Sequence, residues 1–246
     1  MTDVEFLALG LEGLTLVARG SVTEGMNRLD EAVTAALGGE VSDLEAVGNA
    51  SCYVMRACEQ VRDFERAAEW YERVREYFDR WRIPRSLSYC RLHLAAILTW
   101  RGAWVEAENE LLSLFAEMTS MAPGAVEAGR ARLAEIRRRQ GKFEEADGLL
   151  DSVEGTTAAL IGRAGLAFDR GEFEEAGNAV TRYFRRISAN DRMQRLPGLE
   201  ILVPALCRLG REDDARAATA ELRGIAAAVN TNAARALAAM ADGWVA

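Results

Sequence analysis

The sequence predicts an all-α fold built from stacked helical hairpins, and three observations indicate it. One phrase recurs along the chain: GKFEEADGLL begins at Gly141 and GEFEEAGNAV begins at Gly171. Ala, Leu, Glu and Arg dominate the composition and only 4 of the 246 residues are proline, which favours helices. No segment alternates apolar and polar residues with a period of two, so no strand is predicted.

The phrase occurs in six copies, which we call repeats 1 to 6. Each copy starts at an anchor residue, followed two places later by an aromatic or apolar side chain and five places later by Ala or Gly. The anchors are Gly20, Arg62, Gly102, Gly141, Gly171 and Gly210, and in the last copy Glu212 takes the aromatic place. They are 42, 40, 39, 30 and 39 residues apart, and periods of this size are typical of solenoids.

Each repeat predicts a helix A before the anchor and a helix B after it, because apolar residues recur at helical spacing on both sides. A glycine anchor can adopt a positive φ and so end helix A at little cost. The small residue of helix B is expected to let the two helices approach closely. These residues are Ala67, Ala107, Ala146, Ala176 and Ala215, with matching small residues on helix A at Gly13, Ala95, Ala134 and Ala164.

The breaks between repeats are short, so one continuous domain is expected over residues 1–246. They fall at residues 38–42, 82–85, 119–124, 154–156 and 188–194. Pro204 lies inside the helix-A pattern of repeat 6 and is expected either to delay that helix or to kink it. Residues Asn232–Ala241 predict a seventh helix A, and Asp242–Ala246 resembles the start of its turn. An unfinished seventh unit favours a fragment or a short stand-alone homologue.

Charge and composition exclude several classes of partner. The formal net charge of −8 and the sequence pI of about 5.0 argue against nucleic acid and anionic membranes. The N-terminus lacks the basic start of a signal peptide, and no apolar run approaches the roughly 20 residues of a membrane span. The four cysteines are scattered, which is typical of a cytoplasmic protein with reduced thiols.

The repeat frame resembles the tetratricopeptide (TPR) pattern of small residue, Gly, aromatic, Ala and large apolar residue. Most periods here are near 40 residues rather than the 34 of the usual unit. Longer units of this kind resemble the helical sensor region of large LuxR-type, ATP-dependent transcriptional regulators, the MalT-like class. The phrases that carry the resemblance lie between Leu7 and Ala226: EGMNRLDEAV, ACEQVRDFERAAEWYERV, CRLHLAAILTWRGAWVEAE and RRRQGKFEEAD.

The TPR resemblance implies a right-handed superhelix whose A helices line a concave face. It places nine candidate groove residues on repeats 2 to 4: Asn49, Tyr53, Arg56, Tyr89, His93, Trp100, Arg132, Glu135 and Arg138. The arginines are expected to hold a carboxylate or phosphate, and the aromatic residues to supply apolar contact area. The alternative interpretation makes Tyr89 and Trp100 packing residues between repeats and the arginines a solvated, salt-bridged face.

The 30-residue gap before Gly171 predicts a shortened helix A in repeat 5, with Gly162 and Gly165 on its concave side. The superhelix is expected to change pitch there, and the groove of repeats 2 to 4 to end.

Metal binding and catalysis have little support. His93 is the only histidine, and with Cys90 it supplies two ligands where a metal site needs three or four. No nucleophile, base and orienting group form a triad, and a pairing of Glu59 with Glu135 is expected only by chance. A GxxxxGK[ST] phosphate loop and a basic recognition helix, both carried by the LuxR-type regulators, are absent from this sequence.

The leading hypothesis is therefore a non-catalytic, cofactor-free binding module for a peptide, a protein partner or a small-molecule effector. The LuxR-type resemblance implies a role in signal sensing during transcription regulation. The alternative is a structural adaptor that forms a scaffold or a homodimer through its terminal repeats. An enzyme built on the helical repeats is the third and weakest candidate.

Overall fold

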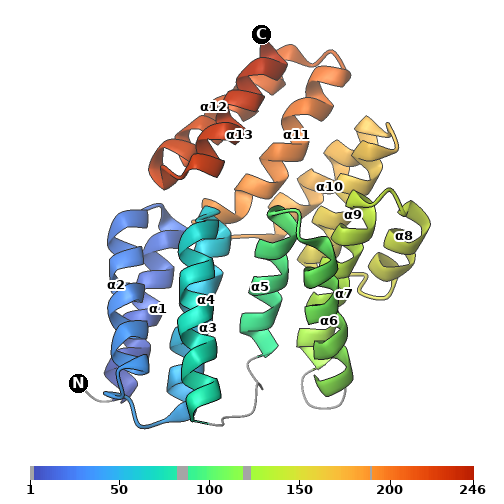
Figure 1. The fold of residues 1–246 in the computed structure, drawn as a ribbon. Coiled ribbons are helices and arrows are strands. Elements are labelled where there is room, and N and C mark those ends of the chain that lie inside the picture. The colour runs from blue at the N-terminus through green and yellow to red at the C-terminus, as the bar shows by residue number, and fades with distance from the viewer. Residues whose placement is uncertain (1–2, 82–87, 119–122, 189) are drawn as a thin grey trace. The chain divides into compact units, whose positions relative to one another are not determined.

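The computed structural model describes residues 3–81, 88–118, 123–188 and 190–246, and within them every regular element is a helix (Figure 1). The helices are α1 (Asp3–Arg19), α2 (Val22–Leu37), α3 (Leu44–Val61), α4 (Phe64–Arg80), α5 (Ser88–Trp100), α6 (Trp104–Met118), α7 (Pro123–Arg139), α8 (Phe143–Asp151), α9 (Thr157–Asp169), α10 (Phe173–Arg186), the short η1 (Met193–Arg195), α11 (Leu196–Arg208), α12 (Glu212–Val229) and α13 (Asn232–Val245). The all-α prediction is confirmed for this part of the chain.

The chain divides into an N-terminal unit, Met1–Met118, and a C-terminal unit, Thr119–Ala246. The first holds the hairpins α1/α2, α3/α4 and α5/α6, and the second holds α7/α8, α9/α10 and α11/α12 with α13 after them (Figure 1). The chain is thus a series of helical hairpins, one for each predicted repeat. The prediction that residues 1–246 form one continuous right-handed superhelix concerns how the two units join, and it stays a prediction.

All six anchors have a positive φ, as predicted for the five glycines among them. The φ values are 98° at Gly20, 55° at Arg62, 81° at Gly102, 75° at Gly141, 81° at Gly171 and 70° at Gly210. In every repeat the N–H after the anchor donates to the carbonyl four residues before the anchor, at 2.9–3.0 Å. This bond and a second one from the anchor N–H cap helix A as in a Schellman motif.

Arg62 shows why one anchor need not be glycine. Its side chain is 6% exposed and its guanidinium lies 4.1 Å from the centre of the Trp100 ring. Asp63 then caps α4 by accepting from the N–H of Arg66. Cation–π contact of this kind is worth about 0.5–2 kcal/mol, which offsets the cost of a left-handed residue with a side chain.

The small residues of the frame form close helix contacts as predicted. Ala67, Ala107, Ala146, Ala176 and Ala215 are all 0% exposed. In the first hairpin two glycines meet, and a Cβ on Gly13 would lie 2.7 Å from the carbonyl oxygen of Gly25. Packing around these positions continues into apolar clusters in each unit, such as Val47 with Phe78 in the first and Leu150 with Leu166 in the second.

The short fourth interval arises from two short helices, the predicted helix A of repeat 5 and also helix B of repeat 4. Helix α9 has 13 residues, as many as α11, whereas α8 has only 9. The chain leaves α8 through successive turns to Gly155, whose φ is 93°, and Thr156 then caps α9. Helix α9 is nevertheless shorter than α1, α3 and α7, which have 17, 18 and 17 residues, so both helix B of repeat 4 and helix A of repeat 5 are short.

The two glycines of α9 face helices of the same unit rather than an open groove. A Cβ on Gly162 would meet Leu150 Cδ2 at 2.6 Å, and one on Gly165 would meet Arg138 Nε at 3.1 Å. The expectation that both lie on a concave surface is wrong at Gly162, which packs against α8. Gly165 is buried beneath the Arg138 side chain.

The predicted turn at Asp242–Gly243 is absent, because α13 runs from Asn232 to Val245 without a break. The Ala246 N–H bonds the Asp242 carbonyl, and the Asp242 side chain accepts from Arg223 Nε on α12 at 2.6 Å. Pro204 lies within α11, which begins eight residues earlier at Leu196, so it does not delay the helix.

Candidate binding surfaces

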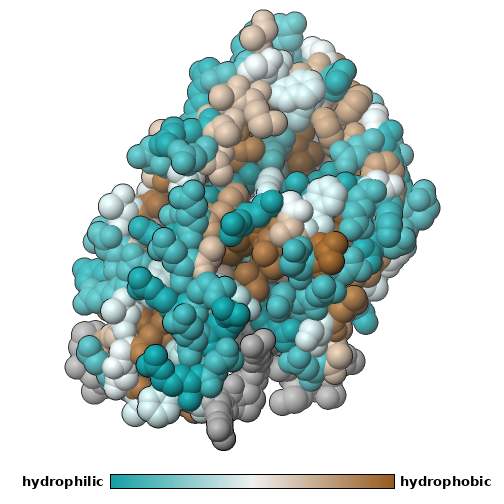
Figure 2. Space-filling model, viewed as in Figure 1, coloured by the Kyte–Doolittle hydropathy of each residue, from teal (hydrophilic) through white to brown (hydrophobic). Residues whose placement is uncertain are grey.

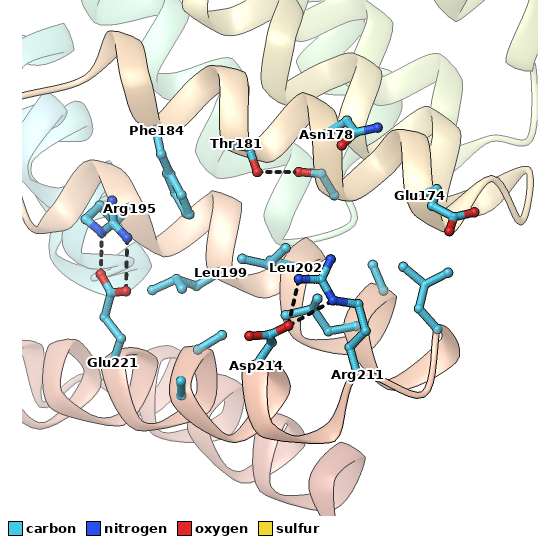
Figure 3. Close-up of a pocket in the computed structure, with 16 residues that line it drawn as sticks. Glu174, Asn178, Thr181, Phe184, Arg195, Leu199, Leu202, Arg211, Asp214 and Glu221 are labelled. Atoms are coloured by element: carbon cyan, nitrogen blue, oxygen red, sulfur yellow. Dashed lines mark hydrogen bonds and ion pairs between the residues drawn. The ribbon is translucent and has the colours of Figure 1, made fainter.

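A solvent-open hollow of about 380 Å³ lies in the C-terminal unit between α10, α11 and α12 (Figure 3). We call it the C-terminal hollow. Leucines of α11, namely Leu199, Leu202 and Leu206, supply much of its apolar lining. Exposed polar side chains of α10, Glu174 and Asn178, lie along one rim. The combination of an apolar floor with a few polar groups at the edge is typical of a recognition surface.

Two ion pairs flank the C-terminal hollow. Arg195, which precedes α11, donates to Glu221 on α12 through Nη2 at 3.0 Å and also through Nε (Figure 3). The hydrogen bond with Glu221 raises the pKa of Arg195, and its guanidinium lies 4.0 Å from the Phe184 ring centre. Arg211 pairs with Asp214 in the first turn of α12, at 2.8 Å from Nε. Both rim arginines are thus already neutralised by carboxylates.

The N-terminal unit contains a second hollow, of about 390 Å³, between α4, α5 and α6. We call it the N-terminal hollow, and Figure 2 shows hydrophobic side chains between hydrophilic ones over this segment. Its floor includes Leu94, Ile97 and Leu98 of α5. Glu106 and Arg101 border it and make no ion pair within the described ranges.

The two hollows occupy the same place in the repeat frame. Each lies between the B helices of consecutive hairpins, over the A helix of the second. Counted from the anchors, ten of the eleven residues that line the N-terminal hollow match a lining position of the C-terminal one. Examples are Ala68 with Gly177 at place +6 and Leu94 with Leu202 at place −8.

A small residue at place +6 of helix B marks both hollows. The six repeats carry Met26, Ala68, Glu108, Asp147, Gly177 and Arg216 at this place, so only repeats 2 and 5 have a small residue there. The B helix of each of these two repeats borders one hollow, and the B helix of the next repeat forms its other wall. This signal lies on the B helices, whereas the predicted groove lies on the A helices.

None of the nine predicted groove residues lines either hollow. On α3, Asn49 and Tyr53 are half-buried and Arg56 is exposed. Tyr53 packs on α1, where its Cδ2 lies 3.1 Å from the place a Cβ on Gly10 would take. Arg56 forms no ion pair or hydrogen bond within the described part of the chain, so its guanidinium is available to a ligand.

The α5 residues connect neighbouring hairpins. His93 Nδ1 forms a hydrogen bond with Glu59 Oε2 of α3, and both side chains are largely buried. The Trp100 ring stacks on Phe64 at a centroid distance of 6.4 Å, beside the Arg62 contact. Trp100 is thus a packing residue between repeats, as the alternative interpretation proposed. Tyr89 is in α5, but its side chain lies outside the described residues.

On α7, Arg138 is committed to an internal network. Its Nε and Nη2 donate to the two carboxylate oxygens of Glu135 at 2.8 Å each, and its Nη1 donates to Asp169 at the end of α9. Arg139 also donates to Glu135, at 2.7 Å. The expectation that Arg138 binds an external anion stays a prediction, and in this structure its donors face the carboxylates of Glu135 and Asp169. Arg132 is half-buried on the same helix.

The pKa values of this network reflect the same contacts. Burial would raise the pKa of Glu135, but hydrogen bonds and charges from Arg138 and Arg139 outweigh it, so the pKa is lowered. Burial would likewise lower the pKa of Arg138, yet Glu135 and Asp169 raise it. Both groups stay charged, and Glu135 is an internal counter-ion rather than a free acid or base.

Other site types find no geometric support in the described ranges. No group of three or more His, Cys, Asp and Glu side chains there is arranged to hold a metal ion. Within the same ranges, no helix combines the length and hydropathy that crossing a bilayer requires.

The class of fold is therefore an all-α series of helical hairpins with a repeated hollow between B helices. A scan against protein-family models finds none that matches the chain, and a search of curated proteins finds no matching sequence.

Proposed function

We propose that this protein is a non-catalytic interaction domain that binds a peptide segment of a partner protein, with the C-terminal hollow as its principal site. The observation that carries the proposal is the recurrence of one hollow, with an apolar floor and polar edges, at one frame position. Repeat proteins use recurrent surfaces of this kind to hold extended or helical partners.

The occupant that fits best is an amphipathic helix with a basic residue on its flank. Apolar side chains at helical spacing would lie on Leu199, Leu202 and Leu206 of the floor. Glu174 is exposed and has no ion-pair partner within the described ranges, whereas Arg195 and Arg211 are neutralised. The charge left over at the rim is negative, which complements Lys or Arg.

The test uses a glycine at which the hollow can be filled without disturbing the fold. A Cβ on Gly177 would meet nothing closer than Leu202 Cδ1 at 3.9 Å, so Gly177→Leu extends into the hollow. The probe is a bead-displayed library of 15-residue peptides with randomised positions. Wild-type protein is expected to enrich peptides with apolar residues at i, i+3 or i+4, and i+7 and a flanking Lys or Arg.

Gly148→Leu is the matched control, because Gly148 is also inside a helix, has no atom within 4 Å of its Cβ position, and does not line the hollow. It should enrich the same peptides as wild type, and Gly177→Leu should not. Equal enrichment by all three proteins, or none by wild type, would overturn the proposal.

The biological setting is a second level of the proposal: signal sensing within a LuxR-type transcriptional regulator of the cytoplasm. It is supported by the resemblance of the repeat phrases between Leu7 and Ala226 and by the helical-hairpin architecture. The neighbouring coding sequence tests it. A phosphate-loop ATPase module upstream and a helix-turn-helix downstream are expected, and a complete gene lacking both would refute the setting while leaving the binding site untouched.

One observation favours the adaptor alternative. Helix α13 exposes Met240 and Trp244, which are 62% and 38% exposed, among alanines on its outer side. A homodimer formed there would be disrupted by Met240→Lys, because a charge would be buried without a partner. Sedimentation equilibrium of both proteins decides between the functions: a wild-type dimer that becomes a monomer on substitution supports the adaptor.

A further inference from the structure

The N-terminal hollow differs in charge from the C-terminal hollow, although both occupy the same place in the repeat frame. At place −1 it carries Arg101, where the C-terminal hollow has Leu209. At place +4 both hollows carry a carboxylate, Glu106 in the first and Asp214 in the second. A cation at place −1 is thus a feature of the N-terminal hollow and not of its counterpart.

The position of the arginine decides whether the carboxylate at place +4 is paired. In the C-terminal hollow Arg211, at place +1, donates to Asp214 from Nε at 2.8 Å. Place +1 of repeat 3 is Ala103, so Glu106 has no arginine at the corresponding position. Within the described ranges, neither Glu106 nor Arg101 forms an ion pair or a side-chain hydrogen bond. Both are exposed, so a partner at this hollow meets one free anion and one free cation.

The other charged side chains that line the N-terminal hollow are already neutralised. Glu72 and Arg75 form an ion pair with each other on α4. Glu110 accepts from Arg91 Nε at 3.0 Å. Any preference of this hollow for a charged partner therefore depends on Arg101 and Glu106.

The apolar surface of the N-terminal hollow extends from its floor onto the outer side of α6. Val105 and Leu112 are 68% and 48% exposed. They lie four residues before and three residues after Asn109, which lines the hollow, so the three share one helix face. The same places of repeat 6 hold Asp213 and Ala220, so the C-terminal hollow lacks these large apolar side chains. Exposed apolar side chains beside an apolar floor are typical of a surface that binds a partner.

We infer that the N-terminal hollow is a second peptide-binding site, specific for an amphipathic helix that carries both an acidic and a basic residue on its flank. The acidic residue pairs with Arg101 and the basic residue with Glu106. Apolar side chains at helical spacing lie on the floor formed by Leu94, Ile97 and Leu98. The class of partner rests on the proposed function, whereas the charge preference is carried by the N-terminal unit alone.

The two hollows are therefore expected to select different segments. A helix flanked only by basic residues fits the C-terminal hollow, where Glu174 is the free charge. The same helix would place no acceptor on Arg101 and would bring like charge to it, which disfavours its binding at the N-terminal hollow.

The randomised peptide library tests this inference together with the proposed function. Wild type should enrich two classes of apolar-faced peptides, one flanked by an acidic and a basic residue and one flanked by basic residues alone. Ala68→Leu extends from place +6 into the N-terminal hollow and should remove only the first class. Gly177→Leu should remove only the second. Ala116→Leu is the matched control, because it adds the same side chain at an exposed place of α6 outside the hollow, and it should retain both classes.

A synthetic peptide of the first class measures the charge preference by fluorescence anisotropy. Arg101→Leu introduces the residue type found at place −1 of the C-terminal hollow and should weaken binding about fivefold. It should leave unchanged the affinity of a peptide analogue whose acidic residue is replaced by glutamine. Glu106→Gln should likewise weaken binding of the original peptide, but not of an analogue whose basic residue is replaced by glutamine. Both substituted residues are exposed, so neither change removes a packing contact.

The outcomes separate this inference from the proposed function. Enrichment of the second class alone, or a first class that survives in Ala68→Leu, would overturn the inference and leave the C-terminal hollow as a site. Enrichment of the first class alone would support the inference and refute the C-terminal site. If circular dichroism shows that Ala68→Leu is unfolded, the affinities of Arg101→Leu and Glu106→Gln decide. Affinities that do not respond to either charge would overturn the inference.

Discussion

Gly13 of α1 and Gly25 of α2 face each other so closely that a Cβ on Gly25 would lie 2.6 Å from the carbonyl oxygen of Gly13. No side chain separates the two backbones at this point of the first hairpin. The contact explains the small residues that the repeat frame places on both helices, because only such residues allow helix axes to approach so closely.

The first prediction concerns this contact. Gly25→Ala should lower the free energy of unfolding by about 1–3 kcal/mol, because the methyl group would force the helices apart. Urea denaturation followed by circular dichroism measures the change. Stability equal to that of wild type would mean that α1 and α2 are not packed as described.

The second prediction separates backbone conformation from packing. Gly141 and Gly148 both have no atom within 4 Å of their Cβ positions, but Gly141 has a φ of 75° whereas Gly148 is helical. Gly141→Ala should therefore destabilise the fold by about 1–2 kcal/mol. Gly148→Ala should stabilise it by about 1 kcal/mol, because alanine favours helix. The same denaturation experiment checks both, and equal effects would contradict the turn assignment.

The third prediction tests the frame itself. Ala107 is 0% exposed on α6, so Ala107→Leu should overpack the hairpin and cost about 1–3 kcal/mol. Ala116 is exposed on the same helix, and Ala116→Leu should change stability little. Calorimetric melting temperatures of the two variants should differ clearly, and coincident values would argue against the frame.

The fourth prediction concerns the Arg138 network. Arg138→Ala leaves Glu135 and Asp169 without a main partner, so it should lower stability by about 1–3 kcal/mol. This loss of stability is expected in the absence of any ligand, because it results from the broken internal ion pairs. Chemical denaturation at neutral pH provides the measurement, and a variant as stable as wild type would mean that the network does not stabilise the fold.

The same network gives a pH dependence with a definite sign. The pKa of Glu135 is lowered from its ordinary value of 4.5, so the unfolded chain binds this proton more readily than the folded one. Its contribution to stability is full above pH 4.5 and is lost as the pH falls through the lowered folded-state pKa. Arg138→Ala should flatten this acid-side decline in stability, and an unchanged slope would contradict it.

Much of the fold could be predicted because its signals are local. A glycine such as Gly102 indicates a positive φ, and Ala107 five places later indicates a close helix contact. Neither inference needs information on residues distant in the sequence. Even Arg62, which breaks the glycine rule, was recognised as an anchor from its neighbours Phe64 and Ala67. The spacing of six anchors thus predicted the six turns.

The candidate sites were less predictable, because they depend on which helix faces meet. No local pattern links Arg138 to Asp169, which is 31 residues away in the sequence. Asp169 accepts a hydrogen bond from the Arg138 guanidinium. The hollows lie between B helices, where the small residues Ala68 and Gly177 carry a weak signal that only the packing explains.

By itself, the sequence determined the helical class, the six turn positions and the small residues at the helix contacts, because each follows from the conformational limits of a few adjacent residues. Only the tertiary structure decided that α13 continues through Gly243 and that Trp100 packs on Phe64. Those outcomes depend on contacts between side chains from separate repeats. The free energy of such contacts cannot be estimated from a few adjacent residues.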